Sequence, residues 1–354
     1  MESCGFGWRE MRWLALLSVS TLALFDAAAA VQTTGEWQQK TVRSPGQPDE
    51  LLRLGNGIYL DVRSQQGGET ARYQRLFLQA GELILEALPH FMVAPGERRP
   101  DMPPDGLIFY GERNIREAWL AGPTRRYAHG VLGDSIEATA LRAVEQTGAQ
   151  AQYELPPNSV FEDRFPRLAD LDGDGRDEIA VVRSYLEWGS ALAIFTLERG
   201  RLRPLAETAP IGQPNRWLNP IGVGELDGDE RPEIALVVTP HIGGVLKIYE
   251  LDGRRLRLEG EAPGFSNHAI GSRELGMSLI IDVDGDGLDE IIVPGSDRKR
   301  LHILSFAGRR LQTLAAVEHP RPIATAIHGL DLDGDGRTEL IYALDEGTVV
   351  VLTR

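Results

Sequence analysis

The stretch Asp331-Leu-Asp-Gly-Asp-Gly-Arg-Thr-Glu339 is one of four acidic nonapeptides in this sequence that align without gaps. The other three copies are Asp170-Leu-Asp-Gly-Asp-Gly-Arg-Asp-Glu178, Glu225-Leu-Asp-Gly-Asp-Glu-Arg-Pro-Glu233 and Asp282-Val-Asp-Gly-Asp-Gly-Leu-Asp-Glu290. Their first residues stand at positions 170, 225, 282 and 331, so the C-terminal half repeats with a period of about fifty residues. A period of this length indicates a fold built from one supersecondary unit used several times.

Each nonapeptide is followed by apolar runs that are typical of β-strands. The first runs are Ile179-Ala-Val-Val, Ile234-Ala-Leu-Val-Val, Ile291-Ile-Val and Leu340-Ile-Tyr, and the second runs are Ala191–Phe195, Val245–Tyr249, Leu301–Leu304 and Thr348–Leu352. A third strand is expected near Leu202, Leu256 and Leu311. With the short stretch before each nonapeptide, the first three repeats have four strands each, which is the size of a propeller blade. We therefore expect an all-β fold, a β-propeller of six or seven four-stranded blades.

The last repeat is too short to complete a blade. Only 23 residues follow Asp331, and they supply strands without an outer partner. An incomplete blade leaves an unpaired edge strand, which is a site of unwanted pairing. We expect a strand around Trp37 to Val42 to fill this place, so that the N- and C-terminal strands together close the ring.

Upstream of the four copies the repeat is weaker. Residues His129 to Leu141 resemble a blade that has lost its acidic loop, with Ala149 to Leu155 and Val160-Phe161 as its outer strands. We expect residues 31–354 to form one β-propeller domain, in which 128–354 hold the clearest repeats and 31–127 hold divergent blades.

The spacing of carboxylates within the nonapeptides predicts metal sites. Carboxylates at positions 1, 3, 5 and 9 of a tight turn can converge on one point, and the backbone carbonyl of position 7 can supply a further oxygen. A flexible cage of oxygen ligands with several carboxylates suits Ca²⁺ better than Mg²⁺. Three calcium sites are expected, with ligands Asp170, Asp172, Asp174, Arg176 and Glu178; Asp282, Asp284, Asp286, Leu288 and Glu290; and Asp331, Asp333, Asp335, Arg337 and Glu339.

The copy that begins at Glu225 departs from the pattern. Its ligands would be Glu225, Asp227, Asp229 and Glu233. Glu225 is longer than the usual Asp, and Glu230 stands where the other copies have the glycine that a sharp turn requires. A fourth calcium site is therefore doubtful from the sequence.

The motif Asp-x-Asp-x-Asp-Gly-x-x-Glu followed by an aliphatic strand is similar to the FG-GAP repeats of integrin-type β-propellers and to bacterial VCBS-type repeats. The similarity covers residues 160–354 well and residues 40–160 poorly. It implies that the acidic loop joins the first and second strands of each blade and binds Ca²⁺ through positions 1, 3, 5 and 9. The Phe-Gly and Gly-Ala-Pro signatures are absent, with Val293-Pro-Gly295 at one such place, so the chain resembles the bacterial variants and adhesion does not carry over.

Composition and the N-terminus indicate an exported protein. The 354 residues carry a formal charge of -15, which offers no basic face for nucleic acid. Arg9 and Arg12 precede an apolar run, and small residues follow it, so residues 1–30 read as a signal peptide cleaved near Ala30, with Met11 as an alternative start. The single cysteine, Cys4, lies within it, which excludes disulfides from the mature chain. We expect a periplasmic or secreted monomer with no membrane span.

No linear catalytic motif accompanies the acidic loops. The leading hypothesis is a non-catalytic binding or scaffold protein with structural Ca²⁺ and an unknown protein or carbohydrate ligand. The alternative is a propeller-type enzyme, namely a polysaccharide lyase, glycoside hydrolase or quinone-dependent dehydrogenase with its site in the channel mouth, and a surface adhesin is a third possibility. The side chains expected near such a mouth are His129, His268, His328, Tyr185, Trp188 and Trp217.

Overall fold

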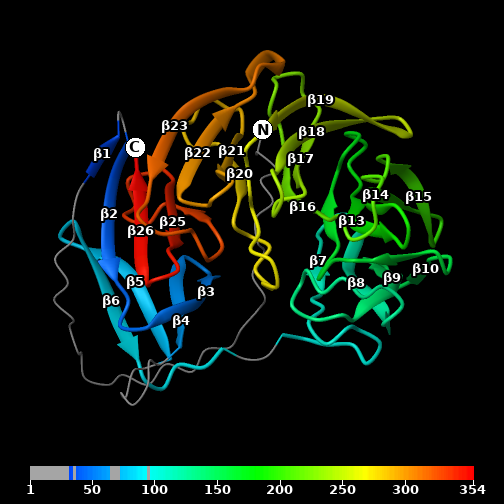
Figure 1. Ribbon diagram of the computed structural model, residues 1–354, viewed down its shortest axis with the longest axis horizontal. Coiled ribbons are helices and arrows are strands. Elements are labelled where there is room, and N and C mark those ends of the chain that lie inside the picture. Colours follow the sequence, from blue (N-terminus) through cyan, green and yellow to red (C-terminus); the bar gives the residue numbers. More distant parts are fainter. Residues whose placement is uncertain (1–31, 35–36, 64–71, 94–95) are drawn as a thin grey trace. The chain divides into compact units, whose positions relative to one another are not determined.

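The computed structural model describes residues 32–34, 37–63, 72–93 and 96–354 (Figure 1). In this part of the chain the regular structure is β-strand, with one short 3-10 turn at Ala307–Arg309 and no α-helix. The all-β prediction is therefore confirmed. The predicted signal peptide, including Cys4 and Met11, lies outside the described residues.

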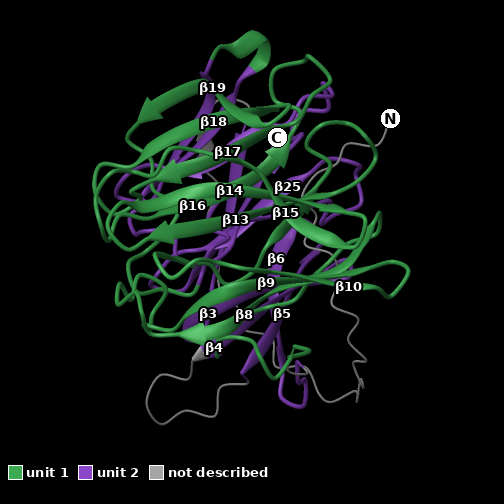
Figure 2. Ribbon diagram, turned by 90° about the vertical axis from the view of Figure 1, so that its right-hand side faces the viewer, with its two compact units in different colours: residues 1–6, 96–273, 307–310 green, residues 7–95, 274–306, 311–354 purple. Residues whose placement is uncertain are grey.

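The chain forms two compact units (Figure 2). Among the described residues, unit 1 contains 96–273 and 307–310, and unit 2 contains the remaining N-terminal residues together with 274–306 and 311–354. Each unit is built from antiparallel sheets, most of which pair strands that follow one another along the chain.

Unit 2 holds three sheets. One consists of β3 (Gln47–Leu54), β4 (Gly57–Arg63), β5 (Tyr73–Gln79) and β6 (Glu82–Leu88) in that order. The second consists of β20 (Leu279–Ile281), β21 (Glu290–Pro294), β22 (Arg300–Ser305) and β23 (Gln312–Glu318). The third has the order β1 (Gln32–Thr34), β2 (Trp37–Arg43), β26 (Thr348–Thr353), β25 (Glu339–Ala343) and β24 (His328–Leu330).

The third sheet combines the two ends of the chain. Strand β2 pairs antiparallel with β26, from Gln38 opposite Thr353 to Arg43 opposite Thr348, and the two ribbons run side by side in Figure 1. This confirms that a strand beginning at Trp37 completes the truncated last repeat. The partner is needed because β26 would otherwise present an unpaired backbone edge.

Two apolar clusters hold the third sheet between the other two sheets of unit 2. One joins Trp37, Tyr342 and Leu352 to residues of β20–β23 such as Ile303. The other joins Val349 and Ile341 to residues of β3–β6 such as Leu60 and Leu76. The sheet formed by the chain ends thus packs one face against the third acidic repeat and the other face against the first sheet of the chain.

Unit 1 contains a nine-stranded sheet and a four-stranded sheet. The large sheet has the path β15-β14-β13-β11-β9-β8-β7, with β10 on β9 and β12 on β13. Its strands are β7 (Phe109–Tyr110), β8 (Ile115–Thr124), β9 (Glu137–Glu145), β10 (Gln150–Glu154), β11 (Ser159–Phe161), β12 (Arg167–Ala169), β13 (Glu178–Tyr185), β14 (Gly189–Glu198) and β15 (Arg201–Glu207). The small sheet is β16 (Leu218–Gly224), β17 (Glu233–Val238), β18 (Val245–Asp252) and β19 (Arg255–Pro263).

Residue pattern decides which strands lie inside and which at the edge. The continuous apolar runs become segments buried on both faces, such as Ile179–Val182 of β13 and Ile234–Val237 of β17, because neither face of the run carries charge. Strand β19 alternates Arg with Leu, and most of its residues are exposed or half-buried at the edge of its sheet. Charged residues on an edge strand discourage pairing with other chains.

Strand β11 departs from the prediction. Val160-Phe161 was expected as an outer strand, but it pairs with β13 on one side and β9 on the other, and both residues are fully buried. The Phe161 ring lies 5.8 Å from that of Phe195, in a T-shaped contact. Burial of this aromatic ring favours the interior position, which a local strand pattern cannot indicate.

Candidate metal centres

All four acidic loops occupy the same place in the strand order. Each joins the first strand of a blade-like group to the strand that pairs with it: β12 to β13, β16 to β17, β20 to β21, and β24 to β25. The glutamate at position 9 is in each case the first residue of the second strand. We number the loops 1 to 4 in chain order, beginning at Asp170, Glu225, Asp282 and Asp331.

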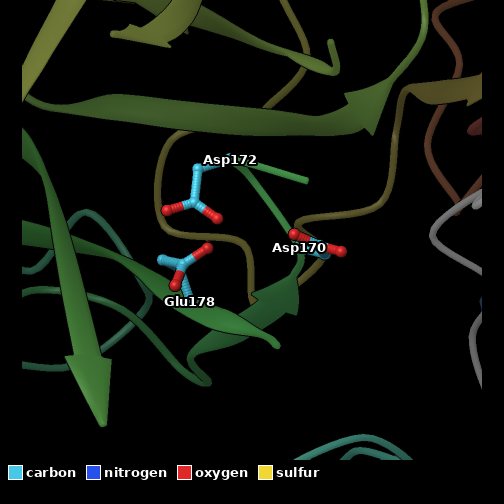
Figure 3. Close-up of side chains that lie close together, drawn as sticks. All are labelled: Asp170, Asp172 and Glu178. Atoms are coloured by element: carbon cyan, nitrogen blue, oxygen red, sulfur yellow. The ribbon is translucent and has the colours of Figure 1, made fainter. Parts of the chain in front are cut away.

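Loop 1 brings three of its predicted ligands together. Asp170, Asp172 and Glu178 each offer a carboxylate oxygen within 4.8 Å of the others. Figure 3 shows the carboxylates of Asp172 and Glu178 turned toward each other, with Asp170 beside them. The same three positions come together in loop 3, as Asp282, Asp284 and Glu290, and in loop 4, as Asp331, Asp333 and Glu339.

Backbone N–H groups orient these carboxylates. In loop 1, Gly173 N–H and Gly175 N–H donate to the two oxygens of Asp170, at 2.8 and 2.9 Å. Leu171 N–H donates to Glu178 Oε2 at 3.0 Å. Both glycines have positive φ angles, 76° and 84°, so the turn that aims their N–H groups favours a residue without a Cβ atom.

Loops 3 and 4 repeat this pattern. Asp282 accepts from Gly285 and Gly287 at 2.6 and 3.1 Å, and Asp331 accepts from Gly334 and Gly336 at 2.7 and 3.0 Å. The position 9 glutamates accept from Val283 and Leu332 N–H at 3.0 and 2.7 Å. Three loops therefore share one arrangement of donors and carboxylates.

The position 5 aspartates lie outside these three-carboxylate groups. Asp174, Asp286 and Asp335 each accept the N–H of position 7 through Oδ1, at 2.8, 2.9 and 2.8 Å. Their role as ligands, and that of the position 7 carbonyls of Arg176, Leu288 and Arg337, stays a prediction.

Burial and the neighbouring negative charges together raise the pKa of the position 9 glutamates. Glu178 has its pKa raised to about 8, and Glu290 and Glu339 to about 7. Desolvation is the largest cause, the neighbouring aspartates add to it, and the backbone N–H bond opposes it. A cation placed among these oxygens would favour their charged form.

The arginines at position 7 have a function that the sequence did not reveal. Arg176 Nη2 donates to the carbonyl of Leu197 at 2.8 Å, and Arg231 Nη2 to that of Leu251 at 2.5 Å. Arg337 Nη1 reaches the carbonyl of Arg354 at 3.1 Å. Each side chain ties its loop to the third strand of the same sheet or to the residue just after it. Their repetition at one motif position was the available signal, although loop 3 has Leu288 there.

Loop 2 differs in its geometry. Its converging group is Glu225, Asp227 and Asp229, and Glu233 is not a member. Glu230 adopts a φ angle of 70°, the left-handed conformation that the glycines adopt in the other loops. The sequence correctly singled out this loop as unlike the rest.

A cavity of about 490 Å³ lies beside loops 3 and 4 in unit 2. Asp282 and Asp284 line it from loop 3 and Arg337 from loop 4, together with Arg354. Arg354 Nη1 lies 3.0 Å from Asp284 Oδ2. The third loop is thus bordered by guanidinium groups as well as by carboxylates.

The histidines that the sequence singled out lie in polar contacts. His129 Nδ1 is 2.6 Å from Glu162 Oε1 in unit 1. His268 Nδ1 is 2.7 Å from His241 Nε2, and both imidazoles contact the Trp217 ring. In unit 2, His328 Nε2 is 2.9 Å from the carbonyl of Leu51.

The two remaining aromatic candidates have different surroundings. Tyr185 donates from its hydroxyl to Glu207, at 3.0 Å to Oε1. Trp188 is 56% exposed. Of the two, only Trp188 presents most of its ring to solvent.

The sequence matches no protein-family model and no curated protein. Among solved structures, the chain is similar to a Bacillus licheniformis rhamnogalacturonan lyase, with 15% identity and a TM-score of 0.43 over 86% of this chain. It is also similar to the rhamnogalacturonan lyase YesW, with 15% identity and a TM-score of 0.46 over 85%, and to the exotype rhamnogalacturonan lyase YesX, with 17% and 0.43 over 87%. The chain spans 66%, 65% and 65% of the lengths of these three structures.

At these TM-scores the likeness does not determine the activity of this chain.

Within the described residues, no helix has the length and apolar character needed to cross a membrane.

Proposed function

We propose that this chain is an exported, calcium-binding β-propeller of the FG-GAP or VCBS type that acts as a non-catalytic binding or scaffold protein. The observation that carries the proposal is the convergence of three carboxylates in each of loops 1, 3 and 4. The same backbone N–H groups fix the orientation of the first and ninth side chains in all three.

The donor set favours Ca²⁺ as the ion. The converging groups are carboxylates only, and hard oxygen ligands select hard cations. Ca²⁺ accepts six to eight oxygens in irregular geometry, whereas Mg²⁺ requires near-ideal octahedra. Backbone carbonyls and water can complete such a shell. We expect these ions to be structural, since each loop connects two paired strands.

The propeller architecture is supported by features within each unit. The described strands include six groups of four in which neighbouring strands pair antiparallel. These groups are β3–β6, β7–β10, β12–β15, β16–β19, β20–β23 and β24–β26 with β2. In unit 2 the last of these packs against the first. A first-to-last contact of this kind is what a ring of six blades requires.

Measurement of bound calcium tests the proposal. The purified protein, freed of metal by chelation and dialysed against Ca²⁺, should retain calcium in loops 1, 3 and 4. Asp170→Asn should lower the calcium content by one ion per chain. Asp252→Asn, which changes the exposed last residue of β18 outside the loops, should leave it unchanged. Absence of bound calcium at millimolar concentration would contradict the proposal.

A second candidate is a propeller-type enzyme such as a polysaccharide lyase, and one specific observation favours it. The Glu162 carboxylate is fully buried, contacts His129 through Oε1 and accepts from Ser184 Oγ at 2.5 Å through Oε2. Burial also raises the pKa of Glu137 to about 9, with the charges of Glu162 and Asp105 adding to the shift. A histidine oriented by a buried carboxyl group is the kind of acid and base pair that eliminations use.

An activity assay separates the two candidates. A lyase acting on rhamnogalacturonan would produce a new carbon–carbon double bond, which absorbs in the ultraviolet. Loss of that activity in His129→Gln, with normal folding and calcium content, would establish the enzyme. If the absorbance of polysaccharide with the protein rises no more than that of polysaccharide without it, the scaffold function stays the proposal.

A further inference from the structure

Loop 2 contains a positive charge supplied by the protein itself. Arg309, in the short segment Ala307–Arg310 of unit 1, places Nε 2.6 Å from Asp227 Oδ2 and Nη2 2.8 Å from Asp229 Oδ2. The backbone of the same segment is anchored there, because Gly308 N–H donates to the carbonyl of Asp227 at 2.9 Å. A guanidinium therefore bridges two of the three carboxylates that converge in this loop.

Two further carboxylates surround the same guanidinium. Arg309 lies 3.5 Å from Glu250 Oε2 and 3.4 Å from Glu259 Oε2. The Glu250 side chain is fully buried and also contacts Arg231 and Arg257. Asp227 is likewise buried, with its side chain 2% exposed. Buried carboxylates of this kind require a fixed partner, and the planar fork of arginine supplies one with directional donors.

The other loops differ in this respect. In the described part of the chain, no ion pair involves Asp170 or Asp172 of loop 1, nor Asp331 or Asp333 of loop 4. In loop 3, Arg354 Nη1 lies 3.0 Å from Asp284 Oδ2, at the third position of the motif. Bridging of the third and fifth positions by one guanidinium is thus particular to loop 2. It also accounts for the converging group there, which includes Asp229 in place of the position 9 glutamate.

We propose, on the basis of the proposed function, that Arg309 takes the place of Ca²⁺ in loop 2 and keeps this loop as a latent metal site. The guanidinium and a divalent ion would occupy the same oxygens of Asp227 and Asp229, so binding of one excludes the other. The protein consequently binds three calcium ions, and its second repeat is held closed without calcium. Removal of Arg309 exposes four acidic groups, Glu225, Asp227, Asp229 and Glu233, to a divalent cation.

Calcium stoichiometry of two neighbouring arginine variants tests this inference. Arg309→Gln removes the bridging charge, whereas Arg310→Gln changes an exposed arginine of the same segment and serves as the matched control. Wild type and Arg310→Gln should bind three calcium ions, and Arg309→Gln should bind four. In chelator, Arg309→Gln should melt at a lower temperature than Arg310→Gln, and added Ca²⁺ should reduce that difference.

A variant that keeps Arg309 provides a second measurement if Arg309→Gln does not fold. Asp229→Asn removes a loop 2 carboxylate that is partly exposed, and the inference predicts no change from three calcium ions. A wild type that binds four ions and loses one in Asp229→Asn overturns the inference while the proposed function stands. Equal stoichiometry in folded Arg309→Gln and wild type also overturns it. Zero calcium in every protein overturns the proposed function itself.

Discussion

Removal of calcium should destabilise unit 2 about twice as much as unit 1. Loop 1 is the one regular acidic loop of unit 1, because loop 2 contains Arg309, whereas unit 2 contains loops 3 and 4. At a calcium concentration tenfold above the dissociation constant, each site adds about 1.4 kcal/mol to the free energy of unfolding. Unit 1 should therefore lose about 1.4 kcal/mol in chelator and unit 2 about 3 kcal/mol.

Hydrogen exchange resolves this difference, because it reports the opening of each strand separately. Amides of β13 and β14 report on unit 1, and those of β21 and β25 report on unit 2. In a thermal melt the same energies correspond to shifts of about 3–6 °C and about 6–11 °C, if a unit of this size shifts about 2–4 °C per kcal/mol.

Two controls make the prediction specific. Asp170→Ala should abolish the response of unit 1 to calcium and leave that of unit 2 intact. Mg²⁺ at the same concentration should restore less protection than Ca²⁺, because it tolerates irregular ligand cages poorly. Equal losses in both units, or no loss in either, would refute the assignment of two calcium sites to unit 2 and one to unit 1.

Three further predictions concern residues outside the regular calcium loops. Glu230→Gly should stabilise the protein by about 1 kcal/mol in urea unfolding, because Glu230 holds a φ of 70°, and Glu230→Ala should bring no such gain. Trp37→Ala should cost about 3–5 kcal/mol, since the ring is buried in a core cluster of unit 2, whereas the exposed Gln38→Ala should cost little in the same assay. His328 has its pKa lowered to about 4 by burial, so its stabilising contribution is complete above its ordinary pKa of about 6.5 and is lost as the pH falls toward 4. The stability difference between wild type and His328→Gln should accordingly shrink by up to about 3 kcal/mol between pH 7 and pH 4, and a constant difference would contradict the shift.

Local chemistry was sufficient to predict the acidic loops and their strands. The alternation of carboxylates and the glycine at position 6 specify a tight turn within nine residues, and the glycines 175, 287 and 336 all have positive φ. The aliphatic runs after each loop form strands because β-branched residues fit a pleated, buried surface. The place of Trp37 beside the last strand was also predictable, since a truncated repeat requires a partner.

Only the tertiary structure decided which distant groups meet. Arg309 stands 82 residues from Asp227, and nothing in either sequence neighbourhood indicates their contact. The bond from Arg176 to the Leu197 carbonyl, the contact of His129 with Glu162, and the interior position of β11 likewise depend on how strands are placed beside one another. Turn conformation and strand formation follow from interactions between near neighbours in the chain. The partner of a charged side chain depends on packing across sheets. Burial removes the water that would solvate a carboxylate, so a buried carboxylate is stabilised by whichever cationic side chains the fold places beside it.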